Sequence, residues 1–293
     1  MNKFTRQLQF QSFLLPVIVV YTLFTIYPLL QSLFLSFTNF GGYSNSYDFV
    51  GFRNYARIFV DDAIRASISY TLLFTFGKAL LVTVLAIPLA MILDQNFITR
   101  NLHRAIFFFP SIPSGLLIAY IWGFILAPIG SGVLNNILKQ LFNIGAQPWL
   151  SDPLLAKLST IFVATWAITG WHAVLYLAFL QSIPKDYYEA ASIDGANRYQ
   201  QTRYITLPLL APAMTISVML LLTGGLKVFE IPFALTKGGP GFETLTVTQV
   251  IVQKGITEAQ YGLASAMSVV FFLIVFMIAI FQVTMMQRRE QDL

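Results

Sequence analysis

Six long apolar segments dominate this chain and decide what it can fold into. They are Phe13–Phe37, Ile68–Leu93, Ala105–Ala127, Leu158–Leu180, Ile205–Phe229 and Leu263–Met286. Each is longer than the roughly 20 residues that a helix needs to cross a hydrocarbon core. Lipid offers the backbone no hydrogen-bond partners, and the segments are too long for barrel strands, so each must form a helix. The sequence therefore predicts an all-α polytopic membrane protein with six transmembrane helices.

The composition agrees with a chain that lies largely in lipid. Charged residues make up 11% and AVILMFWYC residues 56% of the 293 residues, whereas soluble domains carry about a quarter charged residues. Prolines inside the apolar segments would break the helices of a soluble protein but are tolerated in a membrane bundle, where neighbouring helices pack around them. These residues are Pro16, Pro28, Pro88, Pro113 and Pro212.

The loops indicate how the chain lies in the membrane. With six spans, both termini share one side, and the loops on that side carry slightly more Lys and Arg than the longer loops opposite. Because positive residues favour the cytoplasmic side, we expect both termini there. The net charge of +5 comes from single, scattered bases. This pattern argues against nucleic acid as a partner and indicates contact with anionic membrane lipid.

Patterns that carry catalysis are absent from the sequence. The chain has no cysteine and only two histidines, so it lacks a set of zinc ligands. It has no G-x-x-x-x-G-K-[ST] phosphate loop and no G-x-S-x-G nucleophile elbow. We therefore expect no metal site, no enzymatic activity and no cofactor or ATP bound by this chain alone.

Charges near the spans leave a second class of function open. Lys78 lies inside the second segment, and Lys227 and Glu230 lie at the edge of the fifth. Lys78 can snorkel to the headgroups or face a cavity, and Lys227 and Glu230 would share a helix face and pair. An ion-coupled secondary transporter of a small solute is the alternative function, and a membrane channel or scaffold is a third.

A polar segment between the fourth and fifth spans is more ordered than a simple connection requires. Residues 182–210 read SIPKDYYEAASIDGANRYQQTRYITLPLL. Lys185–Asp194 predicts a short helix, and Gly195 stands where a left-handed residue ends a helix. Residues 196–204 predict a second short helix, and Pro208 falls in the first turns of the next span. The pattern predicts a helix–glycine–helix elbow along the membrane face.

Small residues at the centre of this elbow indicate a protein partner. Ala190, Ala191 and Ala196 would let another surface approach closely. An amphipathic helix that merely lies on lipid carries large apolar anchors opposite its bases, and this segment does not. We therefore favour docking of a partner over an interfacial lipid helix.

The elbow resembles the EAA loop of ATP-binding-cassette importer permeases. That family pattern is E-A-A, three residues, Gly, nine residues and I-x-L-P. This chain matches every anchor at the expected spacing, with Glu189, Ala190, Ala191, Gly195, Ile205, Leu207 and Pro208. The stretches DGA at 194–196, LTKGGPG at 235–241 and YDFVGFRNYARIF at 47–59 are similar to the carbohydrate-uptake branch. The resemblance is to maltose-permease-like subunits and covers nearly the whole chain.

This resemblance implies a type I importer permease fold with a cytoplasmic coupling helix, in the cytoplasmic membrane of a bacterium or archaeon. Residues 67–285 would form the ABC transmembrane type-1 domain, with the coupling loop at about 182–208. Residues 1–66 would hold the N-terminal segment, first span and external loop, and residues 286–293 a cytoplasmic tail. The implied partners are a second homologous permease, two cytosolic ATPases that use ATP and Mg, and an extracytoplasmic sugar-binding protein. The implied function is ATP-driven import of a carbohydrate, which we expect to be an oligosaccharide.

The same resemblance gives roles to individual residues. Coupling to the ATPase is expected from Glu189, Ala190, Ala191, Asp194, Gly195, Ala196, Ile205, Leu207 and Pro208. Aromatic faces suit sugar C–H surfaces, and the candidates for the substrate path are Trp166, Trp171, His172, Tyr176, Gly224, Gly225, Lys227 and Glu230. Helix packing is the alternative for these aromatic residues and glycines. The external loop is expected to meet the binding protein through Gly238, Gly239 and Pro240.

Overall fold

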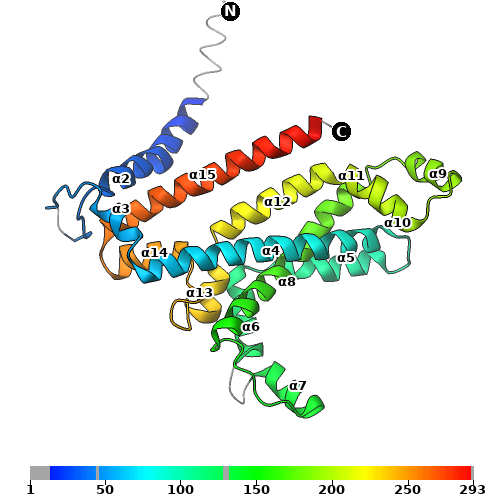
Figure 1. Cartoon of the computed structure of the whole chain (residues 1–293), viewed down its shortest axis with the longest axis horizontal. Coiled ribbons are helices and arrows are strands. Elements are labelled where there is room, and N and C mark those ends of the chain that lie inside the picture. Colours follow the sequence, from blue (N-terminus) through cyan, green and yellow to red (C-terminus); the bar gives the residue numbers. More distant parts are fainter. Residues whose placement is uncertain (1–13, 44–45, 128–131, 292–293) are drawn as a thin grey trace, which may run out of the picture. The chain divides into compact units, whose positions relative to one another are not determined.

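The part of the protein that the computed structural model describes, residues 14–43, 46–127 and 132–291, consists of helices joined by turns and loops, with an isolated β-bridge between Thr38 and Phe49 (Figure 1). Phe13, the predicted start of the first span, lies outside these residues. The chain divides into two compact units, Met1–Arg65 with Val250–Ile274 and Ala66–Gln249 with Val275–Leu293.

The helices follow one another with short connections. The first apolar helix runs over Leu14–Leu35 and contains η1 (Thr22–Ile26) and α2 (Tyr27–Leu35). The elements that follow are α3 (Arg53–Ile58), α4 (Asp62–Asp94), α5 (Arg100–Phe108), η2 (Phe109–Ser111), α6 (Gly115–Ile125), α7 (Val133–Phe142), α8 (Pro153–Leu180), α9 (Asp186–Ile193), α10 (Arg198–Gln201), η3 (Thr202–Thr206), α11 (Leu207–Leu209), α12 (Ala211–Leu226), α13 (Glu230–Thr236), α14 (Val247–Val252), η4 (Gln253–Thr257) and α15 (Tyr261–Gln291).

Four described helices are long and apolar enough to cross a membrane: Leu14–Leu35, Asp62–Asp94, Pro153–Leu180 and Tyr261–Thr284. Two bent pairs pass the same test, Arg100–Ser111 with Gly115–Ile125 and Arg198–Leu209 with Ala211–Leu226. Counted as one span each, the pairs bring the number to 6. The predicted all-α polytopic class is confirmed.

The third and fifth predicted spans are each broken into two helices. The third bends by 93° and the fifth by 64°. Pro113 lies in the first break, and Pro212 lies in the first turn of α12 directly after the second. Because proline has no N–H to donate to the preceding turn, these residues stand where a helix breaks. Pro88, in contrast, lies inside the unbroken α4.

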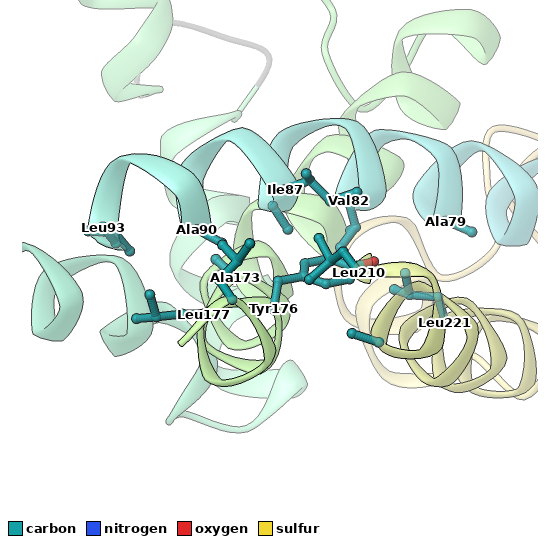
Figure 2. Close-up of a cluster of buried hydrophobic side chains, with 13 residues drawn as sticks. Ala79, Val82, Ile87, Ala90, Leu93, Ala173, Tyr176, Leu177, Leu210 and Leu221 are labelled. Atoms are coloured by element: carbon teal, nitrogen blue, oxygen red, sulfur yellow. The ribbon is translucent and has the colours of Figure 1, made fainter. Parts of the chain in front are cut away.

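The core of the second unit lies where α4, α8 and α12 meet (Figure 2). Lipid gives no hydrophobic drive for helix association, so close packing of small residues has to hold spans together. Alanines supply this close packing on α4 and α8, and larger side chains fill the spaces between them. The buried set comprises Ala79, Val82, Ala86, Ile87, Ala90, Leu93, Ala173, Tyr176, Leu177, Leu180, Leu210, Ala213 and Leu221.

Candidate functional site

The polar segment between α8 and α12 forms the elbow that the sequence predicts. Its first helix, α9, covers Asp186–Ile193, within the predicted range of Lys185–Asp194. Gly195 then adopts φ +81°, so the prediction of a left-handed residue at this position is confirmed. In Figure 1, α9 and α10 lie beyond the ends of α8 and α11 in the second unit.

Hydrogen bonds fix the turn of the elbow. The N–H of Ala196 donates to the carbonyl of Ala191 at 2.9 Å, and the N–H of Gly195 donates to that of Ser192 at 3.2 Å. This pair of bonds satisfies the last carbonyls of α9 in the manner of a Schellman motif. Asn197 then caps α10 by accepting from the N–H of Gln200 at 2.9 Å. The two helices are therefore held at a defined angle.

Side chains tie the two arms of the elbow to each other and to the following span. Gln201 of α10 donates through Nε2 to Ser192 Oγ of α9 at 2.9 Å, and Ser192 Oγ donates to the carbonyl of Tyr188 at 2.7 Å. The hydroxyl of Tyr188 lies 3.1 Å from Oγ1 of Thr206, a buried residue at the end of η3. Hydrogen bonds thus connect α9 to α10 and to the start of the fifth span.

Both ends of the elbow are anchored in the core of the second unit. Ile183, before α9, and Leu207, at the start of α11, are partly buried and pack against the cluster of Figure 2. Ile205 and Pro208 are half-buried in the same region. The I-x-L-P part of the motif is therefore partly buried, whereas most residues of α9 are exposed.

The outer surface of the elbow mixes small and apolar side chains. Glu189, Ala190 and Asp194 are exposed, and Ala191 and Ala196 are half-exposed. Sequence reasoning overlooked Ile193, which is 87% exposed directly before the turn, and Tyr199, which is 75% exposed on α10. The signal that could have identified them in the sequence is the presence of large apolar side chains close to the left-handed glycine. An ordered, partly apolar surface of this kind is suited to docking in a partner's cleft.

The aromatic candidates of α8 fall into two groups. Trp166 and Trp171 are 43% and 37% exposed, whereas His172 is 1% and Tyr176 0% exposed. His172 Nδ1 lies 2.8 Å from Ser217 Oγ of α12, inside the bundle. Trp166 also packs edge-to-face on Trp122 of α6, with ring centroids 5.4 Å apart. Trp166 and Trp171 are therefore partly exposed on the surface of this chain, and the other two side chains are packed between helices.

The paired glycines of α12 have different surroundings. A Cβ on Gly225 would lie 2.8 Å from Cγ2 and 3.0 Å from Cα of Thr75, so α12 and α4 touch backbone to backbone there. A Cβ on Gly224 would meet nothing within 4 Å. Gly225 is thus a close helix-packing position, and Gly224 lies on an open face.

Lys227 and Glu230 do not share a helix, which corrects the expectation from their spacing. The helix α12 ends at Leu226, and Glu230 opens α13, which packs against α6. No ion pair joins Lys227 to Glu230 in the described part of the chain, and both residues are exposed. The carboxylate of Glu230 lies in the first turn of α13, where a negative charge is favourable.

Lys78 does not snorkel out of the bundle. It is 8% exposed, and its Nζ lies 5.5 Å from the ring centroid of Phe74 on the same helix. No carboxylate pairs with it among the described residues. The aromatic ring offers the ammonium a cation–π contact in place of water.

The loop after α13 has a fixed shape. Gly238 has φ +88°, and its carbonyl accepts from the N–H of Thr244 at 3.2 Å. Thr244 Oγ1 donates to the carbonyl of Gly239 at 2.6 Å. Glu243 forms an ion pair with Lys157 at the start of α8. Hydrogen bonds from Thr244 to Gly238 and Gly239 therefore close this turn around Pro240.

Comparison with known proteins places this architecture in one family. The chain belongs to the binding-protein-dependent transport system inner membrane components, whose profile matches residues 82–291. It is 30% identical to the probable starch degradation products transport system permease protein AmyD of Thermoanaerobacterium thermosulfurigenes, over 96% of this chain and 94% of the relative. It is 32% identical to the trehalose/maltose transport system permease protein MalF of Thermococcus litoralis, over 94% of each.

Solved structures share the fold. A bacterial ABC transporter involved in the import of the acidic polysaccharide alginate matches with a TM-score of 0.85 at 24% identity, over 97% of this chain and 96% of that chain. At that identity the likeness concerns the fold alone. The family and the fold together make this chain a multi-pass, non-catalytic membrane subunit of an ABC importer.

Proposed function

We propose that this chain is one of two permease subunits that carry a carbohydrate, in particular an oligosaccharide, across the cytoplasmic membrane of a bacterium or archaeon. The names of its relatives support a sugar as the cargo: starch degradation products, trehalose and maltose, and diacetylchitobiose. An alginate importer of the same fold was solved with an alginate pentasaccharide-bound periplasmic protein, which supports delivery of the cargo by an extracytoplasmic binding protein.

The elbow carries this proposal. It has an exposed, partly apolar surface, an internally bonded turn at Gly195 and ends anchored in the helical core. A stiff element transmits displacement between two packed states, whereas a loose loop absorbs it. We infer that the elbow docks on one of two cytosolic ATPase subunits, which bind ATP and Mg. Residues 67–285 would then form the translocating domain, and both termini would be cytoplasmic.

The substrate path would be lined by those candidate residues that are exposed. Trp166 and Trp171 offer ring faces to sugar C–H surfaces, and Lys227 offers a polar group at the break after α12. His172, Tyr176 and Gly225 would act by holding the helices that form the wall. Gly238, Gly239 and Pro240 would meet the binding protein on the opposite side of the membrane from the elbow.

Docking of the ATPase is tested by purification of the complex. We expect a cytosolic ATPase to co-purify with the intact chain and to be lost when residues 184–204 are scrambled. Glu189→Lys should abolish uptake while the protein still reaches the membrane, and Glu189→Gln is the matched variant that keeps the shape of the side chain. Normal sugar-stimulated ATP hydrolysis by the Glu189→Lys complex would refute the role of Glu189 in coupling to the ATPase.

Transport itself is tested in liposomes. The reconstituted complex should take up sugar only with ATP and the binding protein, whereas an ion-coupled carrier would work with an ion gradient and no ATPase. Trp171→Ala and Lys227→Ala should lower uptake more than they lower ATPase docking. Uptake at the wild-type rate in both variants would remove these residues from the path.

A further inference from the structure

A polar cavity of about 250 Å³ lies in the first unit, between α3 and the residues that lead into α15. Arg53 and Arg57 line it from α3, and Asn39, Asn54 and Gln260 add neutral amide groups. The two arginines are four residues apart, so they lie on one face of the helix. Like charges at this spacing repel each other, and an anion between them would remove the repulsion.

The carboxylates of this unit do not neutralise the two arginines. Within the described residues, each of its acids has another partner: Asp62 pairs with Arg65, Asp61 and Glu258 pair with Lys254, and the carboxylate of Asp48 accepts from Asn39 Nδ2. No ion pair to Arg53 or Arg57 is present in this part of the structure. The cavity therefore holds two positive charges without a counter-charge.

The ion pairs with Lys254 hold the carboxylates of Asp61 and Glu258 in place. Burial opposes the charge on Asp61, but hydrogen bonds from Lys254 and from the backbone N–H groups of Ile64 and Ala63 outweigh it and lower the pKa of Asp61 below its ordinary value of 3.8. Burial also opposes the charge on Lys254, but its hydrogen bonds to Asp61 and Glu258 raise its pKa above the ordinary 10.5. These carboxylates are therefore not free to turn toward the arginines.

The walls of the cavity are held in place before anything binds. Arg57 Nη2 donates to Gln260 Oε1 at 2.8 Å, which ties its guanidinium to another residue that lines the cavity. The buried Asn54 donates through Nδ2 to the carbonyls of Ser36 at 2.9 Å and Thr38 at 2.8 Å. A preorganised site loses little conformational entropy on binding.

We propose that this cavity receives carboxylate side chains of the extracytoplasmic sugar-binding protein. The proposal rests on the proposed function, in which six alternating spans would put α3 and η4 on the side of the membrane opposite the elbow. Small-molecule pockets are typically at least about 300 Å³ and mostly apolar, so a smaller, polar cavity fits one or two acidic side chains better than a sugar chain. The planar guanidinium of arginine is suited to carboxylates through paired hydrogen bonds.

The test measures docking of the binding protein on the complete complex in nanodiscs. The probe is the sugar-loaded binding protein that stimulates ATP hydrolysis by the wild-type complex. Arg53→Glu reverses the charge of a side chain that makes no hydrogen bond or ion pair in the described structure, so folding should be unaffected. Arg65→Glu is the control, because Arg65 lies outside the cavity lining and pairs with Asp62. A Lys substitution of a docking carboxylate on the binding protein supplies the reciprocal variant.

We expect Arg53→Glu to raise the Kd of the binding protein roughly tenfold, mainly by slowing association, and to reduce its dependence on salt. Arg65→Glu should change the Kd less than about twofold, and the reciprocal Lys variant should restore docking on the Arg53→Glu complex. A Kd within twofold of wild type for Arg53→Glu would overturn the proposal and leave the importer function intact. A wild-type complex that no binding protein stimulates would instead overturn the proposed function.

Discussion

Replacing Gly195 by Ala perturbs the elbow at its single left-handed residue. The backbone there has φ +81°, and a Cβ would meet no atom within 4 Å, so steric contact adds nothing to the effect. The remaining cost is that of an L-residue in the left-handed region, about 1–2 kcal/mol. Since 1.4 kcal/mol is a factor of ten, the native turn should lose roughly tenfold in population relative to other turns.

The matched substitution is Gly195→Asn. Asparagine is larger than alanine but enters the left-handed region more readily. If the conformation of this residue matters, Ala should therefore weaken the elbow more than Asn does. If free space matters, the larger Asn should be the worse substitution. Gly51→Ala is a second control, because Gly51 also has positive φ, has nothing within 4 Å of its Cβ position and lies outside the elbow.

The assay is the affinity of the purified ATPase subunit for the membrane-embedded permease pair. We expect Gly195→Ala to weaken docking about tenfold and Gly195→Asn to weaken it clearly less. Gly51→Ala should lower thermal stability by a similar amount and leave ATPase docking unchanged. Equal docking by the Ala and Asn variants, or wild-type docking by both, would show that the left-handed turn does not set the orientation of the elbow.

Three further outcomes can be measured by thermal unfolding of the purified complex. Gly225→Val should destabilise it by about 1–3 kcal/mol because the helices must separate, whereas Gly224→Ala should be neutral or slightly stabilising. Asn54→Ala should destabilise by about 1–3 kcal/mol because two buried carbonyls lose their donor. The lowered pKa of Asp61 adds stability above its unfolded pKa of about 3.9 that is lost as pH falls through the folded pKa. Lys254→Met should therefore flatten the loss of stability between about pH 5 and pH 3.

Each of these outcomes has a clear contrary result. Equal unfolding temperatures for the Gly225→Val and Gly224→Ala complexes would mean that α4 and α12 do not touch backbone to backbone. An Asn54→Ala complex as stable as wild type would indicate that water replaces the amide. An unchanged acid profile in Lys254→Met would mean that Asp61 owes its low pKa to other groups. On the alkaline side, the raised pKa of Lys254 predicts stability that is full below about pH 10.4 and lost as pH rises through the folded pKa.

The elbow could be predicted from sequence because its signals are local. A glycine after a short polar helix identifies a left-handed cap from backbone sterics alone. The bends in the third and fifth spans could not be located in the same way. Pro88, Pro113 and Pro212 all lie in apolar segments, yet only the last two fall at breaks. Whether a proline kinks or ends a helix depends on what the neighbouring helices offer to the freed carbonyls, and that is tertiary information.

For the candidate site, too, the sequence predicts what depends on local signals and misses what depends on tertiary packing. Aromatic residues of α8 were chosen by type, but exposure separates Trp166 and Trp171 from His172 and Tyr176. The 3.6-residue period places neighbours on different faces without telling which face meets another helix. For the same reason the spacing of Lys227 and Glu230 suggested a shared face, and the end of α12 at Leu226 removed it. The predicted contacts of the coupling loop and substrate path remain predictions.

The buried Lys78 has a consequence for how the protein is made. An amine near the middle of a helix adds about 2.5–3.5 kcal/mol to the cost of inserting that helix into a bilayer. The most apolar 18-residue window of the span Asp62–Asp94 has a mean hydropathy of 2.2, so we expect the span to insert despite this residue, but with its amine drawn toward a headgroup. Only when the neighbouring helices pack against α4 can the side chain become buried. Biogenesis should then pass through a stage in which α4 sits at a different depth, and cross-linking during translation would detect the shift.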